Sequence, residues 1–219
     1  MSETRLKILD MAERLFADEG YKAVSLRRIT AAAGVNLAAI HYYFGSKEEL
    51  LDELVMRKAA PVSEARMESL RRLKAAAGTN PIPVEDLLEA FLAPAFHAAD
   101  SSPEFARLMG RLHAEGVMPA VGRKHFGAAG ECFMAELRRA LPAMAEDELA
   151  WRAHFAIGAM AHALSLLPFG PFGRSGAEPP IQVARRMVVF LSGGFRAPVA
   201  ASAKPGTENT GKTIEVGEA

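Results

Sequence analysis

The sequence predicts an all-α protein in two parts, an N-terminal three-helix helix-turn-helix domain and a larger C-terminal helical domain. Half of the 219 residues are hydrophobic and alanine is abundant, a composition that favours helices over sheets. Apolar residues recur at one-turn spacing over most of the chain. Between residues 25 and 50, two short amphipathic segments flank a glycine, as in a helix-turn-helix.

The first predicted helix covers residues 4–18 and has one continuous apolar stripe. The stripe consists of Ile8, Ala12, Leu15 and Phe16. Spacings of three or four residues place these side chains on one side of a helix, and Gly20 ends it. We expect this helix to brace the two short helices that follow.

Residues 25–50 carry the local signals of the helix-turn-helix itself. Ser25 can cap the first short helix, and Gly34 can adopt the positive φ of a tight turn. The second short helix has an apolar side consisting of Val35, Ile40 and Phe44. The following Ser46-Lys47-Glu48-Glu49 has the spacing of a capping box. A motif of this kind places its second helix in the major groove of DNA.

Charges around the predicted turn are basic, although the chain as a whole has no net charge. Between Gly20 and Glu48 the charged side chains are Lys22, Arg27, Arg28 and Lys47. An anionic ligand would therefore meet a locally positive surface. The alternative is an ordinary helical hairpin with a solvated polar side. The glycine turn, the aromatic triplet at 42–44 and the acid-free window together favour DNA binding.

Residues 4–55 resemble the DNA-binding domain of the TetR family of bacterial transcription regulators. The resemblance rests on Leu-Phe-Ala-x-x-Gly-Tyr at 15–21, Ala33-Gly34-Val35, Tyr43-Phe44 and Ser46-Lys47-Glu48-Glu49-Leu50. Thr30 stands where alanine is usual, and His41 stands where tyrosine is usual. The second difference leaves the operator sequence open.

This resemblance and the exposed side of the motif suggest a role for each polar residue. We expect Arg27 to reach a base edge, as the matching position does in TetR-like proteins. The residues expected to face the groove floor are Asn36, Leu37, Ala38 and His41. Those expected to contact phosphates are Ser25, Tyr42, Tyr43 and Lys47, the last at a helix start that favours anions.

Pro61 marks the predicted boundary between a domain at 1–60 and a domain at 61–197. Helical periodicity in the second domain predicts helices near residues 62–77, 84–99, 103–116, 119–141, 146–167 and 180–196. Residues 168–180 are rich in glycine and proline and predict a long connection. Residues 198–219 have little to bury and predict a disordered tail.

The second domain carries no recognisable catalytic constellation, so we expect neither an enzyme nor a cofactor. No phosphate loop, dinucleotide fingerprint or nucleophile elbow is present. The histidines His97, His113, His125, His154 and His162 lack the one-turn spacing of a helical zinc site, and Cys132 stands alone. We therefore expect no metal.

Several features predict a cytoplasmic protein without a membrane span. The N-terminus lacks the apolar core of a signal peptide. The most apolar run, residues 155–172, is broken by His162, Pro168, Gly170 and Pro171. A single cysteine fits a reducing compartment.

Soft and aromatic side chains in the second domain predict an adaptable pocket for a small apolar or amphipathic effector. The candidate pocket residues are Phe91, Met109, His113, Phe126, Phe133, Trp151 and Phe155. For any single one of them, an ordinary core position is the alternative.

Residues 150–167 and 181–195 predict a homodimer interface. One reading head touches only a few base pairs, so useful specificity needs two heads at a fixed spacing. The first segment is rich in small residues and the second in larger apolar ones. TetR-like proteins pair through a bundle of their last two helices. Burial within the monomer is the alternative.

Further motifs, among them Trp151-Arg152-x-His154-Phe155 and residues 189–196, resemble the PsrA-type branch of the family. Members of that branch resemble sensors of long-chain fatty acids or their CoA thioesters. The resemblance implies a repressor that binds a palindromic operator as a homodimer and is released by such a ligand. The alternatives from other classes are a helical adaptor that binds only protein and a small helical enzyme.

Overall fold

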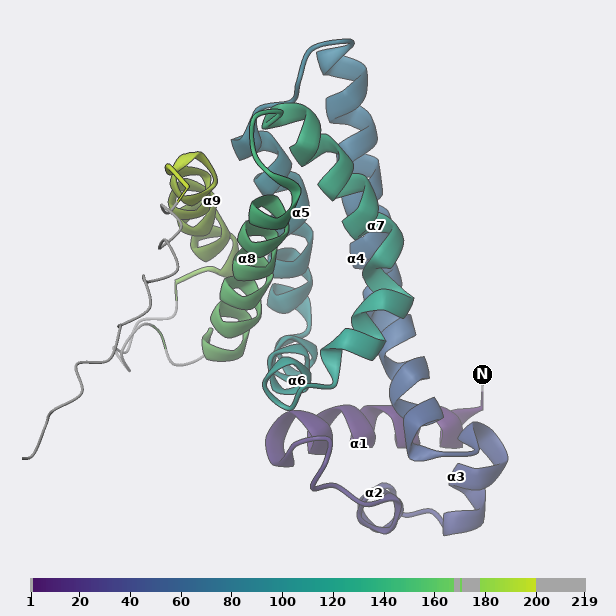
Figure 1. The fold of residues 1–219 in the computed structure, drawn as a ribbon. Helices are drawn as coiled ribbons and strands as arrows, with labels where there is room; N and C mark the ends of the chain where they lie inside the picture. Colours follow the sequence, from purple (N-terminus) through teal and green to yellow (C-terminus); the bar gives the residue numbers. More distant parts are fainter. Residues whose placement is uncertain (1, 168–169, 171–177, 200–219) are drawn as a thin grey trace, which may run out of the picture.

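The computed structural model describes residues 2–167, 170 and 178–199, and most of them are helical (Figure 1). The helices are α1 (Glu3–Glu19), α2 (Leu26–Ala33), α3 (Leu37–Phe44), α4 (Lys47–Ala77), α5 (Val84–Ser101), α6 (Pro103–Ala114), α7 (Met118–Ala140), α8 (Glu146–Leu166) and α9 (Pro180–Arg196). This part of the chain contains no β-strand, and the predicted all-α fold is confirmed. No helix among these residues is long and apolar enough to cross a membrane. The predicted tail beyond residue 199 and most of the predicted connection at 168–180 lie outside the described residues.

Local sequence signals build the helix-turn-helix as predicted. The Ser25 hydroxyl accepts a hydrogen bond from the backbone N–H of Arg28 at 3.2 Å, at the start of α2. Gly34 ends α2 with a φ of 67°, a left-handed conformation that glycine adopts without steric cost. Ser46 and Glu49 form a reciprocal capping box at the start of α4. Short-range hydrogen bonds therefore set where each of these helices begins.

One long helix, α4, crosses the predicted domain boundary. The prediction of two helices separated at Pro61 was wrong, because α4 continues through the proline for a total of 31 residues. A proline inside a helix removes a backbone hydrogen bond and crowds the preceding turn, at a cost of about 3 kcal/mol. The buried side chains of Ala59, Val62 and Leu70 continue one stripe across it. Their packing outweighs the local cost, so both parts of the molecule share a continuous helix.

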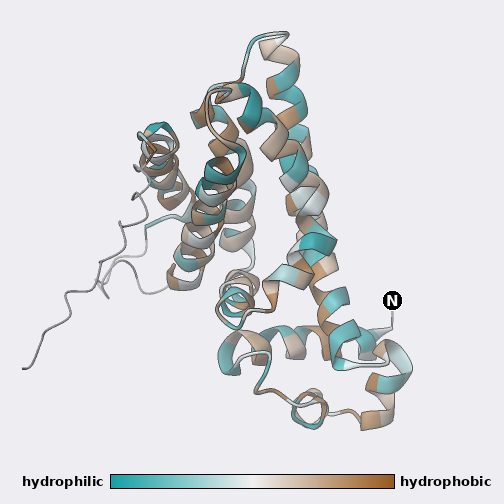
Figure 2. Ribbon diagram, viewed as in Figure 1, coloured by the Kyte–Doolittle hydropathy of each residue, from teal (hydrophilic) through white to brown (hydrophobic). Residues whose placement is uncertain are grey.

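Buried side chains form two clusters, one toward each end of the molecule. The first joins α1–α4 to α6 and includes Phe16, Ile40 and Leu108. The second joins the later part of α4 to α5, α7, α8 and α9, and includes Phe96 and Phe195. Figure 1 shows α1, α2 and α3 at one end, with α4 leading away from them alongside α7. Hydrophobic and hydrophilic stretches alternate along the helices, as expected of amphipathic helices (Figure 2).

Helix α6 comes from the later part of the sequence but packs against α1. Arg111 of α6 donates hydrogen bonds to the carbonyl oxygens of Ala17 at 3.3 Å and Asp18 at 2.8 Å, near the end of α1. Glu115, just beyond α6, accepts a hydrogen bond from the backbone N–H of Lys22 at 2.9 Å. Helix α4 links the two parts directly along the chain. Helix α6 is a second link.

Candidate nucleic-acid interface

Helices α2 and α3 form the surface that the sequence predicted as the reading face. Each helix turns one side to the core, where Ile29 and Ile40 are fully buried. The opposite sides expose most of the predicted contact residues, namely Ser25, Arg27, Asn36, Ala38, His41 and Tyr42. Leu37, Tyr43 and Lys47 are half-buried. Tyr42 is 82% exposed, which leaves a large aromatic side chain free to meet a partner.

Two adjacent arginines of α2 differ in their partners. Arg28 forms an ion pair with Glu19 at 2.9 Å, so its charge is partly compensated. The exposed side chain of Arg27 forms neither an ion pair nor a hydrogen bond with any described residue. Its guanidinium keeps five N–H donors for an external acceptor. Of the two, Arg27 is the better placed to contact DNA.

Asn36 has a structural role that the sequence analysis missed. It is the N-cap of α3, and its side-chain oxygen accepts a hydrogen bond from the backbone N–H of Ala39 at 2.8 Å. A bidentate contact with adenine needs both the side-chain oxygen and the side-chain nitrogen of an asparagine. With the oxygen engaged in the cap, the NH2 group is the part left to face a base. The contact of Asn36 with DNA remains a prediction.

The ring of His41 is oriented by the turn that follows α3. Its Nδ1 lies 2.9 Å from the carbonyl oxygen of Gly45. In a neutral ring, Nδ1 therefore carries the proton and donates it, and Nε2 is left as an acceptor. An acceptor on a helix in the major groove complements the amino groups of adenine and cytosine.

Lys47 packs closely against its own domain. Its ammonium nitrogen lies 4.4 Å from the centroid of the Tyr21 ring, and burial lowers the pKa of Lys47. Burial and the neighbouring carboxylate of Glu48 raise the pKa of Tyr21 to about 12. Glu48 and Glu49 also occupy the first turn of α4, where their charge competes with a phosphate. The phosphate contact of Lys47 remains a prediction.

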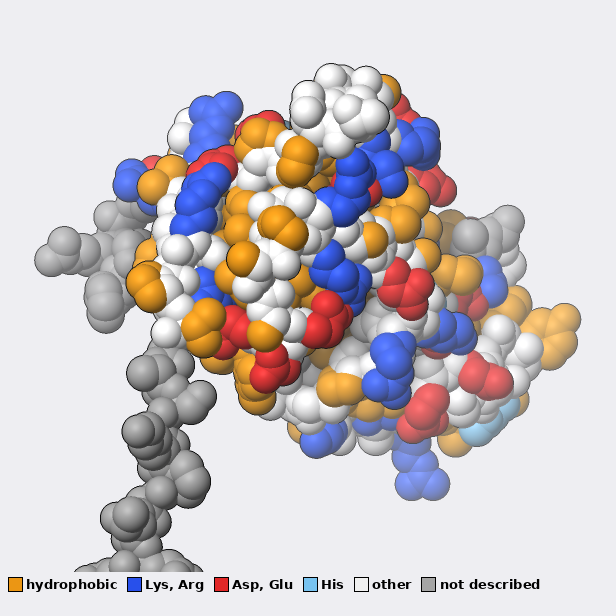
Figure 3. Space-filling model, turned by 45° about the horizontal axis from the view of Figure 1, so that its top comes forward, with side chains coloured by type: hydrophobic (Ala, Val, Ile, Leu, Met, Phe, Trp, Pro, Cys, Tyr) orange, Lys and Arg blue, Asp and Glu red, His pale blue; other side chains and the backbone are white. Residues whose placement is uncertain are grey.

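An acidic residue from the end of α6 borders the acid-free window. Besides its bond to Lys22, Glu115 lies against Gly20, where an added Cβ would be 2.5 Å from a carboxylate oxygen. No local sequence signal could reveal this contact, because Lys22 and Glu115 are 93 residues apart. Basic and acidic side chains also mix elsewhere on the surface, as Figure 3 shows for the view with the upper end tilted forward. The positive surface on α2 and α3 is therefore small and bounded.

The histidines of the second domain do not assemble a metal site in the described part of the chain, where no cluster of three His, Cys, Asp or Glu side chains could hold an ion. His125 instead lies 2.8 Å from Asp52, which Lys124 also contacts at 2.7 Å. Burial alone would raise the pKa of Asp52, but the hydrogen bonds from Lys124 and His125 outweigh it and lower the pKa. These contacts tie α7 to α4.

The predicted effector residues are divided among several places. Phe91 and Phe133 stack in the second core cluster with their ring centroids 4.5 Å apart. Met109 and Phe126 pack against the first core cluster. His113 is half-buried at the crossing of α6 and α8. Two hollows of about 520 and 290 Å³ among the described residues lie on the helix-turn-helix domain, and none of these side chains lines either of them.

Trp151 and Phe155 require a correction. Both were predicted to line the effector pocket, but they are 58% and 61% exposed on the outside of α8. Their rings stack with centroids 5.7 Å apart. The four-residue spacing correctly places them on one side of a helix, but that side faces away from the core. They do not line an interior pocket of the single chain.

Helices α8 and α9 both expose large apolar side chains. In addition to the two aromatic residues of α8, α9 exposes Val189 at 74% and Phe190 at 76%. Large apolar side chains gathered on a surface mark a site of interaction more often than isolated ones do. The exposed sides of α8 and α9 that carry Trp151, Phe155, Val189 and Phe190 are together called the α8/α9 apolar face.

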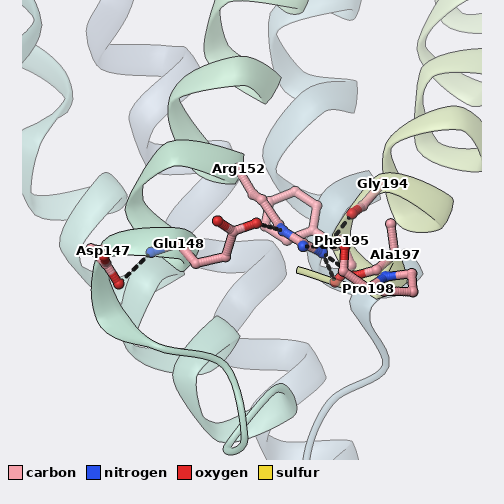
Figure 4. A network of polar contacts seen from close by, with 7 residues as sticks. All are labelled: Asp147, Glu148, Arg152, Gly194, Phe195, Ala197 and Pro198. Carbon is pink, nitrogen blue, oxygen red and sulfur yellow. Dashed lines mark hydrogen bonds and ion pairs between the residues drawn. The ribbon is translucent and has the colours of Figure 1, made fainter. Parts of the chain in front are cut away.

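Buried Arg152 fastens the end of α9 to α8 (Figure 4). Its Nη1 donates hydrogen bonds to the carbonyl oxygens of Gly194 at 2.7 Å, Phe195 at 2.9 Å and Ala197 at 2.8 Å. Its Nε pairs with Glu148 at 2.7 Å. The last carbonyls of a helix lack donors of their own, so a cation is favourable there. The two helices are thereby held as one unit.

Two small residues of α8 pack within the chain. They were predicted to let two chains approach closely, but Ala156 and Ala161 are buried against other helices. A Cβ at Gly110 of α6 would lie 2.4 Å from the Cβ of Ser165 and 3.2 Å from the carbonyl oxygen of Ala161. Only glycine permits this crossing of α6 and α8. Burial within the monomer therefore accounts for Ala156 and Ala161 but not for the exposed aromatic residues, and the predicted homodimer interface remains a prediction.

Two family models match the chain. One, described as bacterial regulatory proteins of the tetR family, matches residues 8–54. The other, described as a tetracyclin repressor-like C-terminal domain, matches residues 89–194. Similar proteins include the HTH-type transcriptional regulator AcrR of Shigella flexneri, with 39% identity over 66 residues, 30% of this chain and 31% of that protein. The HTH-type transcriptional repressor AcnR of Corynebacterium efficiens is 38% identical over 66 residues, 30% of this chain and 35% of that protein. The match thus spans about a third of the length of these relatives.

Solved structures of the same fold cover most of the chain. The TetR family regulator PfmR of Thermus thermophilus has a TM-score of 0.58 and 23% identity, over 84% of this chain and 96% of that one. The fatty acid degradation regulator FadR of Bacillus halodurans has a TM-score of 0.56 and 16% identity, over 90% and 99%. The ketosteroid regulator KstR2 of Mycobacterium tuberculosis has a TM-score of 0.58 and 17% identity, over 89% and 95%. With both domains matched and the fold shared along its length, this chain belongs to the TetR family of bacterial transcriptional regulators.

Proposed function

We propose that this protein is a ligand-responsive repressor that binds a palindromic double-stranded DNA operator as a homodimer. The observation that carries the proposal is the surface of α2 and α3, where Arg27, His41 and Tyr42 are exposed while the other side of each helix is buried. Recognition of the major groove requires a helix with one anchored side and one free side. Because such a protein acts on the chromosome, we place it in the cytoplasm.

In this proposal the exposed residues divide into base contacts and phosphate contacts. Arg27 contacts a base edge, most favourably guanine through its two-pronged guanidinium. Asn36, Leu37, Ala38 and His41 lie along the groove floor. Ser25, Tyr42, Tyr43 and Lys47 hold phosphates and fix the position of the domain on the duplex.

Two copies of the chain pair through the α8/α9 apolar face. Pairing removes Trp151, Phe155, Val189 and Phe190 from water, and burial of apolar surface is the main favourable contribution to stable association. Arg152 supports this role by holding α8 and α9 together. The pairing places two reading heads on one duplex, which a palindromic operator requires.

The proposed effector is a small apolar or amphipathic molecule such as a fatty acid or acyl-CoA, as in the PsrA-type branch that the sequence resembles. Two proteins of the same fold are named as regulators of fatty acid degradation and of ketosteroids, although at 16% and 17% identity they share only the fold. Effector binding would favour a spacing of the two heads that does not match successive grooves, a population shift. Both α4 and α6 reach the head and can carry the displacement.

Fluorescence anisotropy with labelled duplexes from the regions flanking the protein's own gene tests the proposal. We expect nanomolar to micromolar binding to one fragment at low salt and a steep loss of affinity as salt rises. Arg27→Ala should weaken binding, whereas Arg72→Ala, an exposed arginine near the far end of α4, should not. Equal binding of both variants to every duplex would exclude α2 and α3 as the reading surface.

A helical adaptor that binds only protein is the second candidate, because the α8/α9 apolar face is also suited to a foreign partner. The same titration separates the two. An adaptor would bind no duplex at any salt concentration, and its apolar face would be covered by another protein instead of by a second copy.

A further inference from the structure

One charged side chain in the interior differs from all the others that the structure describes. Arg66 of α4 is 3% exposed and lies in the buried stripe of the helix, between Val62 and Leu70. The other buried charged residues each have an ionic partner. Glu13 pairs with Lys58, Glu136 with Lys74 and Arg139, and Arg152 with Glu148. No carboxylate among the described residues lies within 4.0 Å of Arg66.

The surroundings of Arg66 are almost entirely apolar. Its Nε donates a hydrogen bond to the carbonyl oxygen of Phe91 at 2.8 Å, and its Nη2 lies 3.6 Å from the sulfur of Met160. The guanidinium carbon is 4.0 Å from the centroid of the Phe91 ring and 5.6 Å from that of Phe126. A thioether is a weak acceptor. Apart from the bond from Nε to Phe91, no hydrogen bond joins Arg66 to an oxygen of a described residue.

A buried charge without a counter-ion is energetically unfavourable. Taking an ion out of water is costly, and cation–π contacts recover only part of that cost. Burial lowers the pKa of Arg66 to about 10, which still leaves the side chain charged at neutral pH. The free protein thus holds a cation whose strongest possible partner, an anion, is supplied by no described side chain.

We propose that Arg66 binds the carboxylate of an amphipathic effector whose apolar body lies among Phe91, Phe126, Phe133 and Met160. The inference deepens the proposed function and rests on it, because it assumes that the C-terminal domain takes a ligand. A guanidinium offers two parallel donors that match a carboxylate. A small inorganic anion fits less well, because the rings and the thioether would leave its remaining oxygens without donors.

The site can open where the surrounding side chains are half-buried and adaptable. Phe126 and Met160 are only half-buried, and methionine adapts readily to a changed neighbour. On α7, an added Cβ at Gly127 or Gly130 would meet nothing within 4 Å, so no neighbouring element covers these two positions beside Phe126. Displacing the weakly bonded thioether of Met160 would free Nη2 for a carboxylate oxygen.

The position of Arg66 also gives the ligand a direct route to the DNA-binding domain. Arg66 lies on α4, the helix whose first turns pack Leu50 and Leu54 into the head cluster. A carboxylate that draws Arg66 sideways moves the same rigid element that positions α3. No intermediate helix is needed for the effect.

Calorimetric titration of the full chain without DNA tests the proposal, with dodecanoate and 1-dodecanol as probes of equal chain length. We expect the acid to bind at least roughly tenfold tighter than the alcohol, because a charge-assisted hydrogen bond is worth more than a neutral one. Arg66→Met should lower the affinity for the acid about ten- to hundredfold and leave the affinity for the alcohol unchanged. Arg72→Met, at an exposed position of the same helix, should change neither affinity.

Thermal unfolding supplies an independent readout. Without ligand, Arg66→Met should melt no lower than the natural protein, because replacing an unpaired buried charge by a side chain of similar volume is neutral or stabilising. Arg66→Lys keeps the charge but lacks the two-pronged geometry and should retain only part of the preference for the acid. The comparison of acid with alcohol on the natural protein needs no variant at all.

Three results would overturn the assignment of Arg66. The first is equal affinity of the natural protein for acid and alcohol. The second is undiminished binding of the acid to Arg66→Met. The third is tighter binding of dodecanoyl-CoA than of dodecanoate by both the natural protein and Arg66→Met. If neither probe bound, the effector part of the proposed function would fail along with the inference. If the protein bound the acid through Arg66 but ignored every duplex, only the DNA part of the proposed function would fail.

Discussion

At the scale of single residues, the helix-turn-helix separates side chains that build the fold from side chains that are free. Asn36 caps α3 with its side-chain oxygen, and Lys47 lies over Tyr21. Arg27 makes no comparable contact with a described residue and is exposed. The Nε2 of exposed His41 is left as an acceptor by the bond from Nδ1 to Gly45. Sequence specificity is therefore expected to rest mainly on Arg27 and His41.

Arg27→Ala should relax the preference at one base pair of the operator and cost about 1–3 kcal/mol per site. The fold should be unaffected, because the side chain is exposed and has no intramolecular partner among the described residues. Anisotropy titrations against operators changed one base pair at a time measure the effect. A uniform loss on all of them would show that Arg27 contacts phosphate instead.

Lys47→Ala should weaken binding to all sequences alike and lower the slope of log affinity against log salt by about one unit. The reason is that a phosphate contact releases a counter-ion but reads no base. Titrations at several salt concentrations on two unrelated duplexes measure the slope. A changed base preference with an unchanged slope would contradict the assignment, and Lys47 would then serve chiefly to pack against Tyr21.

At the scale of elements, α6 is a link that joins the C-terminal helices to the head. Arg111 holds the end of α1, and Glu115 holds the backbone that follows it.

Arg111→Ala should lower the stability of the protein by about 1 kcal/mol, as expected for hydrogen bonds at a partly exposed site. It should also reduce the effect of an effector on DNA affinity more than it reduces DNA affinity itself. Titrations of operator with and without effector measure both quantities, with exposed Arg123→Ala on α7 as the control.

The contacts of Lys124 and His125 with Asp52 give a pH-dependent connection between α7 and α4. Because the pKa of Asp52 is lowered in the folded protein, its stabilising effect is present above the unfolded pKa and is lost as pH falls through the folded pKa. Asp52→Asn should therefore lower the melting temperature at neutral pH. The difference from the natural protein should shrink as the pH falls through the lowered pKa of Asp52. A difference that is independent of pH would show that the ionic contacts contribute nothing.

Prediction from sequence succeeded where the signal is local and failed where packing decides. The caps at Ser25 and Ser46 and the turn at Gly34 involve residues within three or four positions of one another. The continuation of α4 through Pro61 depends on buried neighbours that the local pattern does not contain. Periodicity placed Trp151 and Phe155 on one side of α8 but could not tell which side faces the core.

Arg66 was also missed, although the sequence contains a signal that could have found it. It falls in register with Ala59, Val62 and Leu70 on the buried stripe of α4. A lone arginine among several charged residues of a helix is usually a solvated side chain, so the register alone is weak evidence. Its burial becomes clear only when α5, α7 and α8 bring Phe91, Phe126 and Met160 around it.

At the scale of the whole molecule, the account depends on two copies of the chain. Phe190 is 76% exposed in a single copy, so Phe190→Asp should leave the fold intact but prevent pairing. A charge at the centre of an apolar interface is strongly unfavourable. Light scattering after gel filtration should report a dimer for the natural protein and a monomer for the variant. Met56→Asp, which changes an exposed apolar residue of the head, should remain a dimer.

The most direct test of the central claim is the stoichiometry of the DNA complex, measured by sedimentation of the protein with its operator at low salt. The account predicts two chains on one duplex, and a large loss of affinity when Phe190→Asp separates them. One chain bound with undiminished affinity, or no binding to any duplex, would contradict it.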